Sequence, residues 1–419
     1  FLLLMAIALE LPAADWKLFR SGAIEVLTDG KDAGARQALN SLDQVRHLSA
    51  RWLAKTEVDA VLGVRLVLST AVPPKPWFLC RDGYLASGLT TATLRGYAAL
   101  LMETNAQRMP EFAEKGMLDV LAELSAEGPR ITLGVPANPT KTWAGMFYLL
   151  TSEAYASRMR VFLSNLQQDA PIDVASRNSL GKPWAEIQKE MDAYWTARSF
   201  EPAQLSGAPI APERQYRDRP IDASEAAKHV ADAKRGTPPP VEELADDAKP
   251  ESKNAVALVA VADAEPSSRI ASMMLEHAAE VAPRWAEPHI QIAALESDLA
   301  RRIPRLKKAV SLRPRDAHLW ETLAEAQTQG QLFNDAAVSY RNAERAAADE
   351  TERASIERRR REYEQSKLDL LAAAKKKEEE EKARELEELK NAALARVRAA
   401  EAKANAQLQG SAKSSGAAP

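Results

Sequence analysis

The chain has 419 residues, with 56 lysines and arginines against 59 aspartates and glutamates, five histidines and one cysteine. The single cysteine, Cys80, excludes an intrachain disulfide framework and a zinc site built on several thiolates. The net charge of −3 offers no strong overall attraction to nucleic acid, and the length predicts two to four domains.

The amino end is apolar from Phe1 to Leu9, and small residues follow Pro12. This pattern is typical of the apolar core and small-residue end of a secretory signal peptide that lacks its basic start. We therefore expect residues 1–14 to be a partial signal peptide and the protein to be exported, to the periplasm or cell envelope. A short buried element of the folded protein is the alternative. No stretch reaches the roughly 18–20 apolar residues of a stable membrane span.

Residues 15–200 are predicted to form a mixed α/β domain. Short apolar runs between turn signals predict strands at 24–28, 64–68, 84–89 and 130–134. Apolar residues at helical spacing predict helices at 32–55, 91–104, 111–124, 142–165 and 183–198.

Residues 201–252 change in composition. Prolines interrupt any long helix, including the triplet Pro238–Pro240, and charged and small residues fill the intervals. This favours a Pro-rich linker with one helix at 222–235. An ordered connection lying on the first domain is the alternative.

Residues 253–349 are predicted to be helical and repetitive. Ala343, Ala309 and Ala278 follow one another at steps of 34 and 31 residues. The last repeat has the tetratricopeptide (TPR) pattern of small and large residues, with Trp320 in its first helix and Tyr340 in its second. Small residues let paired helices approach closely, and larger residues fill the space between them. An ordinary helical bundle with fortuitous spacing is the alternative.

Residues 350–409 are predicted to form one long charged helix. A thin apolar seam recurs at three- and four-residue steps, at Leu386, Leu389, Ala393, Val397, Ala400 and Ala404. The seam permits coiled-coil self-association. A single extended helix, or one folded back on the repeats, is the other expectation. The basic run Arg358–Arg361 lies among acids without aromatic residues, so we expect no nucleic-acid binding. Residues 410–419 are expected to be a disordered tail.

Two segments of the first domain carry a family resemblance. They are Thr93–Leu101 and, after it, Phe112–Asp119. With the preceding strands, they resemble the gluzincin-type zinc-peptidase-like domains found ahead of TPR repeats in bacterial exported proteins. That family has a helix with the pattern His-Glu-Tyr-x-His-Leu and a second helix containing Trp-Leu-x-Glu-Gly. The resemblance implies an α+β peptidase-like domain over 15–200, followed by all-α TPR-like repeats.

At the positions that carry the family's chemistry, this sequence departs from the pattern. Arg95 and Ala99 stand at the two histidine positions, Gly96 at the catalytic glutamate and Lys115 at the third ligand. Protonated Arg and Lys cannot donate to a metal, and Ala and Gly have no donor side chain. The resemblance therefore implies a degenerate metallopeptidase, a pseudoenzyme with no catalytic residues, no metal and no cofactor.

Other residues give weaker signals. A metal site could be rebuilt from Glu103, Glu111 and Glu114 only with further histidine ligands, because His47 is the only histidine of this domain. Ser87 lacks the Gly-x-Ser-x-Gly surroundings of a nucleophile elbow, and Cys80 is expected to be a buried or idle cysteine.

These observations favour a non-catalytic exported protein whose TPR-like repeats bind a protein or peptide partner. The alternative is a hydrolase that uses an unrecognised or rebuilt site in the first domain.

Overall fold

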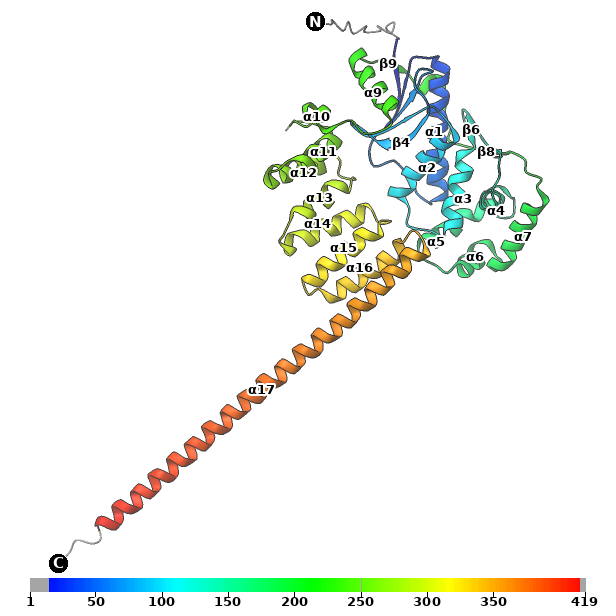
Figure 1. Ribbon diagram of the computed structural model, residues 1–419. Helices are drawn as coiled ribbons and strands as arrows, with labels where there is room; N and C mark the ends of the chain where they lie inside the picture. Colours follow the sequence, from blue (N-terminus) through cyan, green and yellow to red (C-terminus); the bar gives the residue numbers. More distant parts are fainter. Residues whose placement is uncertain (1–14, 250, 415–419) are drawn as a thin grey trace, which may run out of the picture. The chain divides into compact units, whose positions relative to one another are not determined.

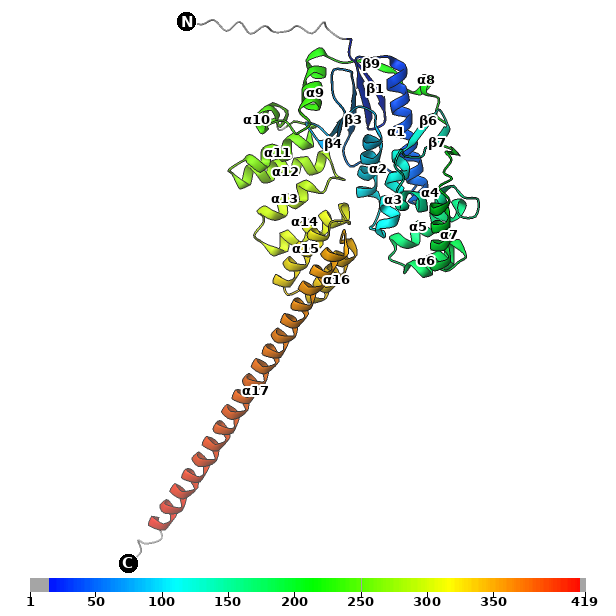
Figure 2. The same ribbon diagram turned by 45° about the vertical axis from the view of Figure 1, so that its right-hand side comes forward.

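A computed structural model describes residues 15–249 and 251–414, with side chains through residue 406. The expected signal peptide at 1–14 and residues 415–419 of the expected tail lie outside the described residues. The chain divides into two compact units, residues 1–356 and residues 357–419. The first unit holds an α/β region with a mixed sheet, followed by a mostly helical region (Figures 1 and 2).

The main sheet has six strands in the order β4-β5-β3-β2-β1-β9. Their bounds are Lys17–Ser21 (β1), Ile24–Thr28 (β2), Val64–Leu68 (β3), Lys75–Leu79 (β4), Tyr84–Ser87 (β5) and Asp218–Pro220 (β9). β2, β3 and β5 are parallel neighbours, and the remaining pairs are antiparallel. The parallel centre follows from the crossover through helix α1, Asp32–Trp52, which connects β2 to β3.

Alternate residues of the central strands serve two cores. Val26 and Leu66 point into the large core with α1, whereas Leu27 and Val67 join a second cluster with Ala233 of α9, Ala223–Arg235. Successive side chains of a strand point to opposite faces, so both faces of this sheet are covered. Figures 1 and 2 both show α9 on the side of the sheet opposite α1.

The rest of the α/β region consists of helices and a smaller sheet. The helices are Thr91–Asn105 (α2), Glu111–Ala122 (α3), Lys141–Thr151 (α4), Met159–Gln167 (α5), Ile172–Leu180 (α6) and Trp184–Ala197 (α7), with a short 3-10 turn at Ala156–Arg158. Leu124–Glu127 (β6), Arg130–Leu133 (β7) and Ala203–Ser206 (β8) form the antiparallel sheet. The helix expected at 142–165 is thus two helices, α4 and α5.

The Pro-rich stretch 201–252 lies on the α/β region, which agrees with the alternative of an ordered connection. It supplies edge strands to both sheets, β8 and β9, and the helix α9, which covers one sheet face. Short helices at Pro212–Gln215 (α8) and Val241–Leu244 (α10) and a 3-10 turn at Ala245–Asp247 complete it. Tyr216, between α8 and β9, is buried. These contacts correct the expectation of a flexible linker.

The following region consists of helices packed in chain order. Their bounds are Ala255–Ala264 (α11), Ser268–Val281 (α12), Glu287–Leu295 (α13), Leu299–Leu312 (α14), Ala317–Gln329 (α15) and Phe333–Ala346 (α16). Consecutive helices contact one another, and short connections make them antiparallel. Side-chain caps start several of them: Asn254, Ser267, Asp298 and Asp316 each accept from a backbone N–H of the following first turn.

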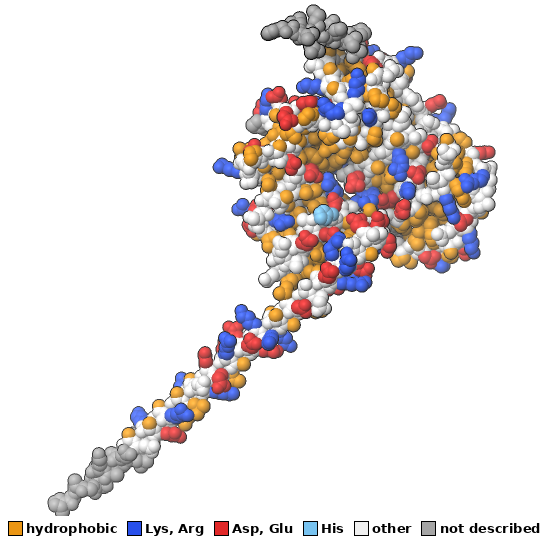
Figure 3. Space-filling model, in the orientation of Figure 1, with side chains coloured by type: hydrophobic (Ala, Val, Ile, Leu, Met, Phe, Trp, Pro, Cys, Tyr) orange, Lys and Arg blue, Asp and Glu red, His pale blue; other side chains and the backbone are white. Residues whose placement is uncertain are grey.

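The last helix, α17, runs over Glu350–Ser414. It confirms the expected long helix, and it extends beyond residue 409 into the segment expected as a tail. Figure 3 shows lysine, arginine, aspartate and glutamate interspersed along it. Among the described residues, no helix combines the length and apolar character that crossing a bilayer requires.

Candidate functional site

The positions that resemble the peptidase motif lie on α2 and α3. Arg95 on α2 donates from Nε to Asp119 Oδ1 on α3 at 2.9 Å. A cation and a carboxylate therefore connect these helices. Ala99, one turn after Arg95 on α2, adds no polar group.

Gly96 is closely packed against Trp77 of β4. A Cβ atom on Gly96 would lie 2.8 Å from Trp77 Cδ1. The indole is held in place because its Nε1 donates to the Thr93 carbonyl at 2.7 Å. A glutamate at position 96 would therefore require the indole ring to move.

The third motif position, Lys115, is exposed and pairs with Glu111 one turn earlier on α3, at 3.4 Å. Glu114 is not in an open site either. It accepts a hydrogen bond from the Met109 backbone at 2.6 Å and pairs with Arg108 at 3.3 Å and with Arg315. This carboxylate connects segments of the α/β region to the helical region.

The two other candidate residues, Ser87 and Cys80, are hydrogen-bonded or buried. Ser87 Oγ donates to the Pro73 carbonyl at 2.5 Å. Burial raises the pKa of the Cys80 thiol to about 12, which keeps it protonated at neutral pH. Within residues 15–249 and 251–414, no three His, Cys, Asp or Glu side chains converge in a way that could hold a metal ion.

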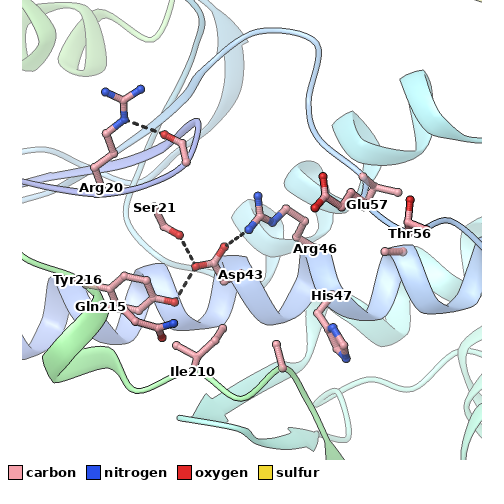
Figure 4. Close-up of a pocket in the computed structure, with 14 residues that line it drawn as sticks. Arg20, Ser21, Asp43, Arg46, His47, Thr56, Glu57, Ile210, Gln215 and Tyr216 are labelled. Atoms are coloured by element: carbon pink, nitrogen blue, oxygen red, sulfur yellow. Dashed lines mark hydrogen bonds and ion pairs between the residues drawn. The ribbon is translucent and has the colours of Figure 1, made fainter.

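A polar cleft of about 530 Å³ lies beside α1 (Figure 4). At its centre, Asp43 Oδ2 accepts from Tyr216 at 2.6 Å and from Ser21 at 2.7 Å. Asp43 Oδ1 faces Arg46 Nη2 at 3.0 Å. Burial first, and then the Asp43 carboxylate, raise the pKa of the Tyr216 phenol, so the phenol remains protonated.

The cleft does not combine a nucleophile with a base. Figure 4 shows His47 pointing away from Asp43 and Ser21. Burial, and then the nearby Arg51, lower the pKa of His47, so its imidazole is neutral at pH 7. The Ser21 hydroxyl donates to a carboxylate that already has two other partners. This arrangement suits the binding of a polar ligand, and it holds the Tyr216 phenol in place. It does not activate the Ser21 hydroxyl as a catalytic triad would.

Arg315 of the helical region lies against the α/β region. Arg315 is 5% exposed, and it donates to the Met102 carbonyl at 3.4 Å as well as to Glu114. Burial lowers the pKa of Arg315, which the Glu114 carboxylate partly offsets. In the other direction, Arg108 of the α/β region donates to the Ala346 carbonyl at 3.2 Å.

The helical region also presents a polar face to solvent on α15. His318, Glu325 and Gln329 are exposed and Thr322 between them is half-buried, at steps of four, three and four residues. Such steps place side chains on one helix face. Leu319 and Leu323 lie on the opposite, buried face, in a cluster with α14.

Two of these features could not be predicted from the sequence. The Asp43–Tyr216 and Glu114–Arg315 pairs join residues 173 and 201 positions apart, beyond the reach of any local spacing rule. Comparison with protein-family models finds no match to the chain. Comparison with curated proteins finds no relative either.

Proposed function

We propose that this chain is a non-catalytic, exported binding protein whose TPR-like helical region, 253–349, holds a protein or peptide partner. In this proposal, residues 15–200 descend from a gluzincin-type metallopeptidase that has lost its metal ligands. The observation that carries the proposal is the series of consecutive antiparallel helices, because such stacks offer extended surfaces to partners.

The packing of these helices supports a TPR-like reading. Ala278, Ala309 and Ala343, the three alanines in phase, are all fully buried. Tyr340 is 6% exposed, in agreement with an aromatic core position. The Trp320 indole donates to the Pro314 carbonyl at 3.0 Å, which ties the start of α15 to the preceding turn.

The contacts made by the residues at the motif positions support a non-catalytic role. Arg95 is paired with Asp119, and Gly96 is packed against Trp77. A water-activating glutamate and a zinc ligand would have to replace groups that already hold α2 and α3 together or pack against β4.

We assign partner contact to the polar face of α15, defined by His318, Thr322, Glu325 and Gln329. The test places a photo-crosslinking amino acid at position 322 of the full-length chain and irradiates it in an envelope extract. A discrete cross-linked partner is then purified and titrated against the intact chain and a Glu325→Lys variant.

The matched control carries the crosslinker at Glu186, an exposed position on α7. We expect position 322 to capture the partner, position 186 not to capture it, and Glu325→Lys to weaken binding at least about tenfold. Equal capture at both positions, or equal affinity of the variant, would exclude the α15 face.

A further inference from the structure

The second compact unit of the chain has apolar side chains in contact with solvent. Leu386, Leu389 and Val397 of α17 are 55%, 68% and 55% exposed. An isolated helix keeps such side chains in water, whereas pairing with another helix would bury them.

These residues follow an eleven-residue period. The seam runs 386, 389, 393, then 397, 400, 404, so each member of the first set recurs after eleven residues. Position 408, which begins a third set, is again leucine. Eleven residues in three turns give about 3.67 residues per turn, close to the 3.6 of a straight helix. The seam therefore stays on one side of α17 and winds slightly to the right.

We propose that residues 385–404 of α17 pair with the same segment of a second copy, as a parallel, in-register two-helix coiled coil with nearly straight or slightly right-handed winding. The proposed helical partner-binding function does not depend on this contact. The occupant is a second copy because the charges that flank the seam complement one another between copies in this arrangement.

The flanking charges lie on both sides of the seam. Glu385 and Arg396 flank one side, and Lys390 and Glu401 flank the other. In a parallel pair, a flanking residue faces the partner's residue five positions further on, as in heptad coils. Glu385 then faces the partner's Lys390, and Arg396 faces the partner's Glu401. Both contacts are attractive, and the two-fold symmetry doubles them.

An antiparallel pair gives this match only in part. Aligning the seams in opposite directions places Ala393 against the partner's Val397, since the paired positions then sum to 790. Arg396 would lie beside the partner's Arg396 near the centre of the pair, whereas Lys390 would lie beside the partner's Glu401. The antiparallel pair thus combines two attractive contacts with one repulsive contact. The parallel pair has four attractive contacts, so the charge pattern favours the parallel arrangement.

The pairing segment is bounded on its amino-terminal side. One period earlier, the seam positions carry Lys375, Glu378 and Lys382, which disfavour burial. The apolar contact is therefore about 20 residues, or about 30 Å, long. A contact of this length, with alanine at half of its seam positions, predicts a dimer that dissociates on dilution.

The first test is the mass of the full-length chain by analytical ultracentrifugation across a dilution series. We expect a monomer–dimer equilibrium, and we expect Leu389→Glu to raise its dissociation constant more than about tenfold. The matched control is Leu394→Glu, because Leu394 is 54% exposed but lies off the seam, about 100° around the helix from Ala393. A monomer at every concentration, or equal effects of the two variants, would overturn the proposal.

The second test fixes the direction of the two helices. Ala404→Cys in the full-length chain should form a disulfide-linked dimer under mild oxidation, because position 404 faces itself in a parallel pair. In the antiparallel alignment, the two copies of position 404 would be 18 residues, about 27 Å, apart. Failure of Ala404→Cys to cross-link, or equal cross-linking of Ala399→Cys on the far side of the helix, would overturn the parallel arrangement. The native Cys80 is buried, so the unmodified chain serves as the blank.

Discussion

Arg315, two residues before α15, donates a hydrogen bond to the Glu114 carboxylate on α3. The side chains of the pair are 5% and 13% exposed, so the ion pair is largely removed from water. Glu114 also satisfies the backbone N–H of Met109, at the turn before α3. One carboxylate thus orders a local turn and fastens the helical region to the α/β region.

Breaking this pair should destabilise the whole first unit. We expect Arg315→Ala to lower the free energy of unfolding by about 1.5–3 kcal/mol, because Glu114 would lose one of its two cationic partners and keep only Arg108. Urea denaturation of the full-length chain measures the loss. Arg301→Ala is the matched control, since the Arg301 side chain is 77% exposed and should contribute less than about 1 kcal/mol. Equal effects of both variants would show that the buried Arg315–Glu114 pair stabilises the fold no more than the exposed Arg301–Asp298 pair does.

Tyr340 should be a core residue of α16. Replacing a buried aromatic with alanine typically costs about 3–5 kcal/mol, and Tyr340 is 6% exposed. Thermal unfolding should therefore shift clearly downwards for Tyr340→Ala. The exposed Glu379→Ala on α17 should leave the transition unchanged. An unaltered melting temperature for Tyr340→Ala would exclude the repeat phase that we assign.

The central strands were predictable because their residues are apolar and bounded by turn residues. β2 and β3 occur at the predicted positions, 24–28 and 64–68. The prediction missed β1, β4, β6, β8 and β9, and all of these except β1 lie at sheet edges. Edge strands tolerate proline and polar residues, as Pro76 in β4 and Pro220 in β9 illustrate, so they lack the apolar alternation that identifies a strand.

The sites were less predictable than the elements. Sequence placed Glu114 on a helix near the expected cleft but could not supply its partner, Arg315. Likewise, the prolines of 201–252 correctly predicted interrupted helices but not the burial of Tyr216 against Asp43. Both errors have the same physical origin: tertiary partners distant in sequence decide whether a charged or proline-rich segment is solvated or packed.

His229 on α9 should make stability depend on pH. Its imidazole is 3% exposed, and Arg65 Nη1 lies 2.6 Å from Nε2. Burial, and then the Arg65 charge, lower the pKa of His229 from 6.5 to about 4, against the weaker opposite effects of Asp82 and Asp232. Above pH 6.5 the residue is neutral in both states. As the pH falls from 6.5 to 4, only the unfolded state takes up the proton, so stability is lost.

The loss from His229 should reach at most about 3 kcal/mol at pH 4. Denaturation of the chain at several pH values, compared with His229→Gln, measures it. We expect the variant to lose less stability between pH 6.5 and pH 4, and we expect exposed His318→Gln to follow the unmodified chain. Parallel pH profiles for the chain and His229→Gln would contradict the assignment.

Gly96 should be intolerant of any side chain. Gly96→Ala places a Cβ 2.8 Å from a held indole carbon, and overpacking of this kind typically costs about 1–3 kcal/mol. Gly34→Ala on α1 is the control, because no atom lies within 4 Å of the added Cβ, and it should be neutral or stabilising. Equal stability of the two variants by chemical denaturation would show that Trp77 yields freely, and position 96 would then be open to a catalytic glutamate.

We propose that this chain binds a partner and does not catalyse metal-dependent hydrolysis. This proposal is tested most directly by the zinc content of the purified full-length chain, measured by mass spectrometry after dialysis without chelator. We predict far less than stoichiometric zinc, because Arg95, Gly96, Ala99 and Lys115 cannot supply the ligands and base that a catalytic zinc requires. Stoichiometric zinc, accompanied by peptide hydrolysis that is lost when the metal is removed, would contradict the account.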